Sequence, residues 1–331
     1  MDRKLIVMPD DSAAPILDAI GAATKSLRIK MFSLTDERVL SAIIDAHKRK
    51  VHIRVLLNPA RRSGQIQNKG SRVVLTSAGI DVLDTNPDFA VTHEKSMVVD
   101  DSMALIGSLN WDTAFEETRD YAVVTDDPDE AGEVAECFDA DWSREPFIPR
   151  RASSLIWCPG PGREQIAAFI DHAKHSLYVQ NERFQDAIIV ERLVRAQLRG
   201  VKVRVMTRPS HSLRANQLVE GIGDLRIMQD VGVEIRKIKH FKLHAKMLLA
   251  DKSRAIVGSI NLSASSFDDR RELALAVGEP AVVNRLVDVV RDDWKHSRIL
   301  DLSDDAVLSD LDRHPKRGGR PGLSSVATTA G

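Results

Sequence analysis

The sequence predicts an α/β protein made of two homologous domains, in which strands are covered by helices. Three observations carry this prediction. The chain has 331 residues, which is long for one domain and suits two. Its sequence repeats at an offset of about 150 residues, and segments of helical and strand periodicity alternate in each half.

The repeat is visible at several positions that keep their order and spacing. A single match of this kind could be a coincidence, but matches in one register indicate a duplicated domain. The matching segments are "KSLRIKMF" (25–32) with "HSLYVQNERF" (175–184), 40–60 with 190–210, 77–85 with 230–238, and 93–110 with 244–261.

The elements can be assigned in order along the first half. Residues 13–24 carry apolar side chains at helical spacing, and "LRIKMF" (27–32) alternates as a strand does. Residues 37–49 return to the helical period, and "VHIRVLL" (51–57) is a strand rich in β-branched residues. The second half repeats this order and begins with the helix "REQIAAFIDHAK" (163–174).

We place the first domain at residues 1–147 and the second at 152–302. The segment "REPFIPRRASS" (144–154) is rich in proline, arginine and serine and is the predicted linker. Residues 313–331 have almost nothing apolar to bury, so we expect a disordered tail whose basic cluster is solvated.

Composition limits the possible environments. With 43% apolar residues the chain can bury full cores, and the net charge of −1 neither favours nor excludes an anionic partner. Cys137 and Cys158 are expected to be reduced, buried thiols. The N-terminus has too short an apolar run for a signal peptide, and no window resembles a membrane span. We therefore expect a soluble, cytoplasmic protein, with peripheral association to a membrane left open.

The repeated segment "HEKSMVVDDSMALIGSLN" (93–110) concentrates reactive groups around a strand. Side chains at i and i+2 share one face of a strand, so each half presents a histidine with a lysine and a serine with an asparagine. Lysine, serine and asparagine are a poor metal set but suit a tetrahedral anion such as phosphate. Histidine can add proton transfer or nucleophilic attack. These residues are His93, Lys95, Ser108, Asn110, His244, Lys246, Ser259 and Asn261. Gly107 and Gly258 precede the serines and could let the backbone approach a ligand closely.

Both copies read H-x-K, four residues, D, six residues, G-S-x-N, and in this the sequence resembles the phospholipase D superfamily over about residues 12–300. The resemblance implies two homologous α/β domains, each a mixed, mostly parallel sheet covered by helices, related by a pseudo-twofold axis. It also implies one active site between the halves, without a metal or other cofactor.

The same resemblance implies the roles of the motif residues. One histidine attacks phosphorus and forms a phosphohistidine, while the other acts as general acid and base. We assign His93 as nucleophile and His244 as acid/base, with the reverse assignment left open. The lysines and asparagines are expected to hold the phosphoryl oxygens, assisted by the serines.

Each histidine needs a carboxylate to fix its tautomer. The family places an acidic residue some ten residues after G-S-x-N, which suggests Asp120 and Glu272, with Glu116 and Glu117 as competitors. The motif aspartates lie an odd number of residues from the histidines and should face away on a regular strand. We expect Asp100 and Asp251 to be structural and to order the following turn.

The substrate is less constrained than the chemistry. The second half looks similar to cardiolipin synthases and small bacterial phospholipases, which favours a phospholipid at a membrane surface, with hydrolysis or transfer to an alcohol. The runner-up is a metal-independent nuclease, for which basic stretches at 47–50, 60–64 and 207–217 could contact phosphates. The same stretches could meet anionic headgroups or be plain solvated surface. A non-catalytic binding module is disfavoured by two intact motifs. We expect a monomer with no obligate protein partner.

Overall fold

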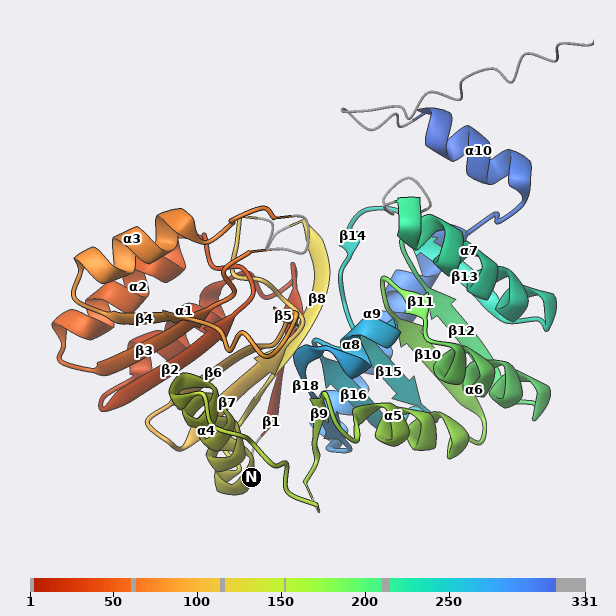
Figure 1. Ribbon diagram of the computed structural model, residues 1–331. Coiled ribbons are helices and arrows are strands. Elements are labelled where there is room, and N and C mark those ends of the chain that lie inside the picture. The colour runs from red at the N-terminus through yellow and green to blue at the C-terminus, as the bar shows by residue number, and fades with distance from the viewer. Residues whose placement is uncertain (1–2, 61–63, 114–116, 152, 210–214, 314–331) are drawn as a thin grey trace, which may run out of the picture.

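The computed structural model describes residues 3–60, 64–113, 117–151, 153–209 and 215–313, and it forms two α/β lobes that meet along the middle of the molecule (Figure 1). The first repeat contains β1 (Arg3–Met8), α1 (Ala14–Ala22), β2 (Ser26–Met31), α2 (Glu37–Lys48), β3 (His52–Leu57), α3 (Lys69–Ser77), β4 (Asp81–Asp84), β5 (Val91–Thr92), β6 (Lys95–Val99), β7 (Met103–Gly107), β8 (Thr118–Thr125) and α4 (Pro128–Ser143).

The second repeat follows a similar order from the next strand onward, with additional short elements inserted in it and further elements at its end. It contains β9 (Leu155–Cys158), α5 (Gly162–Asp171), β10 (Ser176–Gln180), β11 (Phe184–Gln185), α6 (Ala187–Leu198), β12 (Lys202–Met206), α7 (Ala215–Asp230), β13 (Glu234–Ile238), β14 (Lys242–Leu243), β15 (Met247–Ala250), β16 (Arg254–Gly258), β17 (Leu262–Ser263), α8 (Ala264–Asp268), β18 (Arg270–Val277), α9 (Pro280–Lys295), β19 (Ser297–Ile299) and α10 (Asp304–Arg313).

Local sequence explains where a typical helix begins. The side chain of Asp36 accepts hydrogen bonds from the backbone N–H groups of Arg38 and Val39 and so caps α2. Val39, Leu40 and Ile43 then recur at helical spacing and are buried. The helix ends at Lys48, within one residue of the segment that the sequence predicts.

The sheets are mixed, as expected, but the expectation that they are mostly parallel is wrong. The first sheet has the order β1-β8-β7-β6-β2-β3-β4, and among the described neighbours in this order β2–β3 and β3–β4 are parallel while the other four pairs are antiparallel. In the second sheet β15, β16 and β18 likewise pair antiparallel. The reason is that the strands of each repeated motif are joined by tight turns, which permit only antiparallel neighbours.

Two short strands leave their own repeat and pair with the other one. β5, just before the first motif, pairs parallel with β18 of the second repeat, with Thr92 opposite Arg271. β14, just before the second motif, pairs parallel with β8 of the first repeat, with Leu243 opposite Arg119. The exchange is reciprocal, because the same short strand of each repeat pairs with the same long strand of the other. It places the two motifs next to each other.

The hydrophobic core has three parts. One lies under α1, α2 and α3 in the first lobe, and a second lies under α5, α6 and α7 in the second lobe. The third is shared: α4, α9 and the facing strands of both sheets contribute to it, including Tyr121 and Trp157. Burial of this shared core joins the repeats by the same hydrophobic effect that stabilises each lobe.

The remaining sequence expectations can be located as follows. Residues 144–151 connect α4 to β9 without helix or strand, in the predicted linker. The predicted tail lies outside the described residues apart from Arg313, the last residue of α10. Cys137 and Cys158 are buried free thiols, as expected. Within the described ranges no helix combines the length and apolar character that crossing a membrane requires.

Candidate active site

The two histidines are placed by the exchanged strands. The backbone N–H of His93 donates to the carbonyl oxygen of Arg271 at 2.9 Å, and that of His244 donates to the carbonyl oxygen of Arg119 at 3.1 Å. Each motif is thereby held against the sheet of the other repeat. The two imidazole ring centroids lie 6.4 Å apart, so both motifs build a single site.

The orienting carboxylates come from the opposite repeat. Nδ1 of His93 lies 3.0 Å from Oε2 of Glu272, and Nδ1 of His244 lies 3.0 Å from Oδ1 of Asp120. The structure therefore brings together the two carboxylates that the sequence suggested, but crosswise. Of their competitors, Glu117 forms an exposed ion pair with Lys242, and Glu116 lies outside the described residues.

Burial sets the ionisation of these pairs. Burial, reinforced by the two lysines, lowers the pKa of His93 to about 3, although Glu272 opposes this. Burial alone would raise the pKa of Glu272, but His93 and Lys95 outweigh it and hold this pKa at about 2. Burial also lowers the pKa of His244. Both imidazoles are thus neutral near pH 7, with Nδ1–H donated to a carboxylate and Nε2 left available.

Both motif lysines are buried beside the histidines. Nζ of Lys95 donates to the backbone carbonyl of His93, and Nζ of Lys246 donates to that of His244. Burial, followed by repulsion from Lys246, lowers the pKa of Lys95 well below its ordinary value. An anion bound between these two lysines would relieve that repulsion, which makes the position suited to a phosphoryl group.

The motif asparagines carry unsatisfied polar atoms. Oδ1 and Nδ2 of Asn261, and Oδ1 of Asn110, are buried and have no hydrogen-bond partner among the described residues. Buried amide atoms are normally satisfied in native proteins. A ligand with several oxygen atoms could supply these partners, in agreement with the predicted binding role.

The serines and glycines of the motif serve the strands behind the site. Oγ of Ser108 donates to Oδ1 of Asp120 at 2.6 Å, and Oγ of Ser259 bonds both backbone polar groups of Leu273. These fully buried hydroxyls hold the carboxylate strands in place, and their expected contact with a substrate stays a prediction.

The two glycines allow a close approach between neighbouring strands, whereas the sequence suggests a close approach between their backbone and a ligand. A Cβ on Gly107 would lie 2.6 Å from Cβ of Ala122, and one on Gly258 would lie 2.3 Å from Cα of Ala274.

The motif aspartates are structural, as expected, but they order a different segment. The carboxylate of Asp100 accepts from the backbone N–H groups of Thr24, Lys25 and Ser26. Asp251 does the same for residues 174–176 of the second repeat. Each therefore fixes the connection into β2 or β10, and not the turn that follows it.

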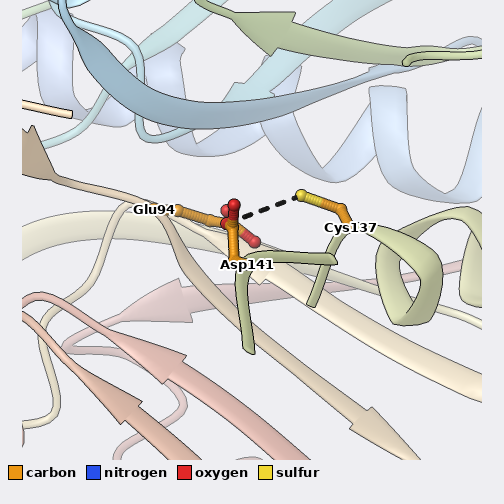
Figure 2. Close-up of side chains that lie close together, drawn as sticks. All are labelled: Glu94, Cys137 and Asp141. Carbon is orange, nitrogen blue, oxygen red and sulfur yellow. Dashed lines mark hydrogen bonds between the residues drawn. The ribbon is translucent and has the colours of Figure 1, made fainter. Parts of the chain in front are cut away.

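A buried group of possible metal ligands lies behind His93, but a lysine fills it. Glu94 immediately precedes β6, and Cys137 and Asp141 lie on α4. The three side chains point toward one another (Figure 2). Nζ of Lys30 lies 3.0 Å from Oε2 of Glu94, 2.8 Å from Oδ2 of Asp141 and 3.4 Å from Sγ of Cys137. The ammonium already supplies the positive charge that a metal ion would bring, so these residues do not fit a metal.

Two residues near the second motif were not singled out as site residues from the sequence. Glu182, between β10 and β11, lies 3.6 Å from Nζ of Lys246. Arg208, after β12, lies 2.9 Å from the carboxylate of Glu182, and its Nε donates to the carbonyl of Leu243 at 2.6 Å. In the sequence Arg208 stands out only as part of a basic stretch. The sequence difference between the two repeats at these positions, Phe32 against Glu182 and Asn58 against Arg208, is the signal that could have identified both residues.

A comparison with models of known protein families shows to which family the chain belongs. The model described as "Cardiolipin synthase, PLD-like domain" matches residues 16–142 and again 166–294, which is most of the chain. The chain belongs to the phospholipase D superfamily. The two matched ranges also confirm the duplication inferred from the internal repeat.

Curated relatives of this superfamily carry several names. The chain is 25% identical to polyphosphate kinase of Vibrio parahaemolyticus over 80% of its own length and 39% of the kinase. It is 22% identical to cardiolipin synthase 1 of Bacillus anthracis over 89% of its length and 66% of that protein. It is 34% identical to phospholipase D of Rickettsia felis over 36% of its length and 58% of that protein. The chain thus spans about half the length of such relatives.

Solved structures support the fold. Phosphatidylserine synthase of Haemophilus influenzae matches with a TM-score of 0.68 at 12% identity, covering 93% of each chain. Polyphosphate kinase of Porphyromonas gingivalis matches with a TM-score of 0.70 at 15% identity, covering 94% of this chain and 52% of the kinase. At these identities the likeness concerns the two-lobed phospholipase D fold alone.

Proposed function

We propose that this chain is a phospholipase D-like phosphodiesterase that acts on phospholipids through a phosphohistidine intermediate and can transfer the phosphatidyl group to alcohols. The observation that carries the proposal is the pair of histidines whose ring centroids lie 6.4 Å apart, each held through Nδ1 by a carboxylate. Two buried lysines bond to the backbone carbonyls of these histidines, and the motif residues Asn110 and Asn261 carry buried amide atoms without a hydrogen-bond partner among the described residues.

The first step uses both histidines at once. The lone pair on Nε2 of His93 attacks phosphorus and forms a P–N bond. The bond from phosphorus to the leaving oxygen breaks, and its electron pair stays on that oxygen. A phosphodiester anion bound beside His244 favours its protonated form, and the protonated His244 gives its Nε2 proton to the leaving oxygen, so the alcohol departs neutral. Lys95 and Lys246 stabilise the negative charge on the remaining phosphoryl oxygens.

The second step reverses these roles with a new oxygen nucleophile. Water or an alcohol attacks phosphorus while its proton passes to Nε2 of His244. The P–N bond breaks and its electron pair returns to His93. Water yields a phosphomonoester such as phosphatidic acid, and an added alcohol yields a new diester. Both histidines then have their starting protonation states.

Phospholipids are the favoured substrates because two kinds of observation agree. The curated relatives include proteins named cardiolipin synthase and phospholipase D. The basic stretch at residues 47–50 is already engaged in the fold, since Lys48 pairs with Asp45 and Arg49 donates to the carbonyl oxygens of Gly21 and Ala23 at the C-terminal end of α1.

The test is an assay of purified protein on phospholipid vesicles, on single- and double-stranded DNA, and on inorganic polyphosphate. We expect phosphatidic acid from vesicles and phosphatidylethanol when ethanol is present. His93→Ala and His244→Ala should each lose several orders of magnitude in turnover, because the groups act as a unit. The exposed His175 provides a control, and His175→Ala should retain activity.

Other outcomes would redirect the proposal. DNA cleavage at enzyme concentrations that leave every phospholipid intact would place the chain among nucleases, and transfer from polyphosphate alone would align it with the kinase relatives. We also expect turnover to survive EDTA and to be inhibited by vanadate. The lysines supply the charge for the transition state that vanadate resembles.

A further inference from the structure

The two halves of the site are unequal at one pair of equivalent positions. In the first repeat Met31 is paired with Lys95 across β2 and β6, and the next residue is Phe32. In the second repeat Gln180 is paired with Met247 across β10 and β15, which sets residue 181 opposite Lys246 and makes Glu182 the next residue. An aromatic ring in one half therefore corresponds to a carboxylate in the other.

These two side chains contact the catalytic groups in different ways. The Phe32 ring packs against the His93 ring with centroids 5.0 Å apart, and Nζ of Lys95 lies 5.0 Å from the Phe32 centroid. Glu182 instead places a charged oxygen 3.6 Å from Nζ of Lys246. Glu182 is only 8% exposed, so this charge is poorly screened by water.

A second unequal pair supports the first. Asn58 follows β3, and its Oδ1 accepts from the backbone N–H of Thr92 at 3.1 Å, just before His93. Arg208 follows β12 and donates to the carbonyl of Leu243, just before His244. Arg208 also holds Glu182 at 2.9 Å, so the carboxylate is fixed from both sides by Arg208 and Lys246.

We propose that Glu182 is a positioning residue that makes the two histidines unequal: its carboxylate holds Lys246 and favours the protonated form of His244, so that His244 acts as acid/base and His93 as nucleophile. This inference rests on the proposed function. It assigns to Glu182 a role that neither motif contains.

The charges around His244 support the direction of this effect. Asp120 and Glu182 favour its protonated form, while Lys246 opposes it and burial lowers its pKa. Arg208 and Lys246 hold the pKa of Glu182 well below its usual range despite burial, so Glu182 is ionised. His93, which packs against Phe32, has its pKa lowered to about 3, first by burial. A proton shared between the histidines therefore favours His244.

The direct test is an NMR titration of His244 in the substrate-free protein. Glu182→Gln keeps the shape and a hydrogen-bonding group but removes the charge. We expect the His244 titration to move to lower pH, on the order of one unit, because the Glu182 charge favours the protonated imidazole and a nearby opposite charge shifts a buried group by that order. Arg208→Gln should move the His244 titration to higher pH, since the Glu182 carboxylate is then no longer neutralised by the Arg208 guanidinium. Asp45→Asn, in an exposed pair with Lys48, is the matched control and should leave it unchanged.

The second test uses activity on the diester identified above. In the rate profile against pH, Glu182→Gln should shift the alkaline limb to lower pH and reduce kcat more than it changes KM. Glu182→Asp should restore part of the shift, and Phe32→Leu should leave the position of the limb unchanged even if it slows the reaction. Rapid acid quenching followed by peptide mapping should find the phosphoryl adduct on His93.

The outcomes are distinct. An unchanged His244 titration in both Glu182→Gln and Arg208→Gln, or an adduct on His244, would overturn the proposed role of Glu182. A wild-type protein with no diester turnover would overturn the proposed function instead, and the titration would still decide what Glu182 does to His244.

Discussion

Each motif histidine is paired with a carboxylate from a distant part of the chain. His93 and Glu272 are 179 residues apart, and His244 and Asp120 are 124 apart. A carboxylate that accepts Nδ1–H keeps Nε2 unprotonated and directed at the substrate. Neither repeat contains a complete histidine–carboxylate pair, so a site with correct tautomers requires both.

The first prediction concerns this tautomer control. Asp120→Asn should preserve the fold but lower kcat by about 10³–10⁴, because an amide no longer selects the required tautomer. KM should change much less, since the lysines and asparagines remain. Glu117→Gln, an exposed neighbour paired with Lys242, is the control and should stay near the wild-type rate. Steady-state kinetics would contradict the crosswise assignment if Asp120→Asn stayed within tenfold of the wild type.

The second prediction concerns pH and stability. The pKa of His93 falls from 6.5 in the unfolded chain to about 3 in the fold, so the unfolded state binds the extra proton between these values. This contribution to stability is complete above about pH 6.5 and is lost progressively as the pH falls toward 3.

Urea unfolding at about pH 6.5 and pH 5 measures this loss directly. The wild type should lose about 2 kcal/mol more over this interval than His93→Gln, which has no such proton to bind. Comparing the change with pH, and not the absolute stability, removes the cost of placing glutamine in the core. Equal losses in both proteins would show that His93 does not carry the linkage.

At the scale of residues, the sequence predicts most of the residues of the site but not which carboxylate pairs with which histidine. The spacing of the two motifs predicted His93, Lys95, His244 and Lys246 as one site, and the structure places their side chains together. The crossing of the carboxylates was not predictable, because it depends on strand exchange between repeats. The packing role of Gly107 is not visible in the sequence, because the tight packing of β7 on β8 leaves no residue-level pattern of its own.

At the scale of elements, the exchanged strands β5 and β14 are only two residues long. Strands so short cannot be identified from alternation, which needs four or more residues. The longer strands and the helices were visible because their apolar positions repeat, as in α2. The strand periodicity could not correct the expectation of mostly parallel sheets that the family resemblance implied, because alternation reports burial and not whether neighbouring strands run parallel or antiparallel.

The third prediction tests how closely the motif strand approaches its neighbour. Gly258→Ala would bring a Cβ to 2.3 Å from Cα of Ala274 on β18, which forces the backbones apart. We expect a loss of about 1–3 kcal/mol in the free energy of unfolding, and lower activity because Glu272 moves with β18.

A helical glycine in open surroundings gives the opposite control. Gly223 in α7 has nothing within 4 Å of a built Cβ, so Gly223→Ala should stabilise by about 0.5–1 kcal/mol. Urea unfolding of both variants under the same conditions compares them. A neutral Gly258→Ala would mean that β16 and β18 can separate without cost.

At the scale of the whole molecule, buried ion pairs cross between the repeats along the shared core. Arg271 of β18 pairs with Asp141 of α4 at 3.0 Å, and Arg119 of β8 pairs with Asp293 of α9 at 2.9 Å. These pairs are related by the internal repeat. With a common core between them, we expect the two lobes to unfold as one cooperative unit.

The first repeat adds a further pair that the second lacks. Lys30 and Glu94 are buried together, with 3.0 Å between Nζ and Oε2. The matching positions of the second repeat hold Gln180 and Ala245, and Gln180 donates there to Asp293. The second repeat therefore shows that this fold tolerates a neutral pair at these positions.

The last prediction uses that comparison. Lys30→Gln should destabilise by about 3–5 kcal/mol, because it leaves the buried charge of Glu94 without its partner. Adding Glu94→Ala removes that charge and reproduces the second repeat, so the double variant should recover part of the loss despite the cavity that alanine leaves. Urea unfolding of both single variants, the double variant and the wild type completes the cycle. A double variant no more stable than Lys30→Gln would show that Lys30 stabilises the fold through Asp141 alone, and that Glu94 does not depend on it.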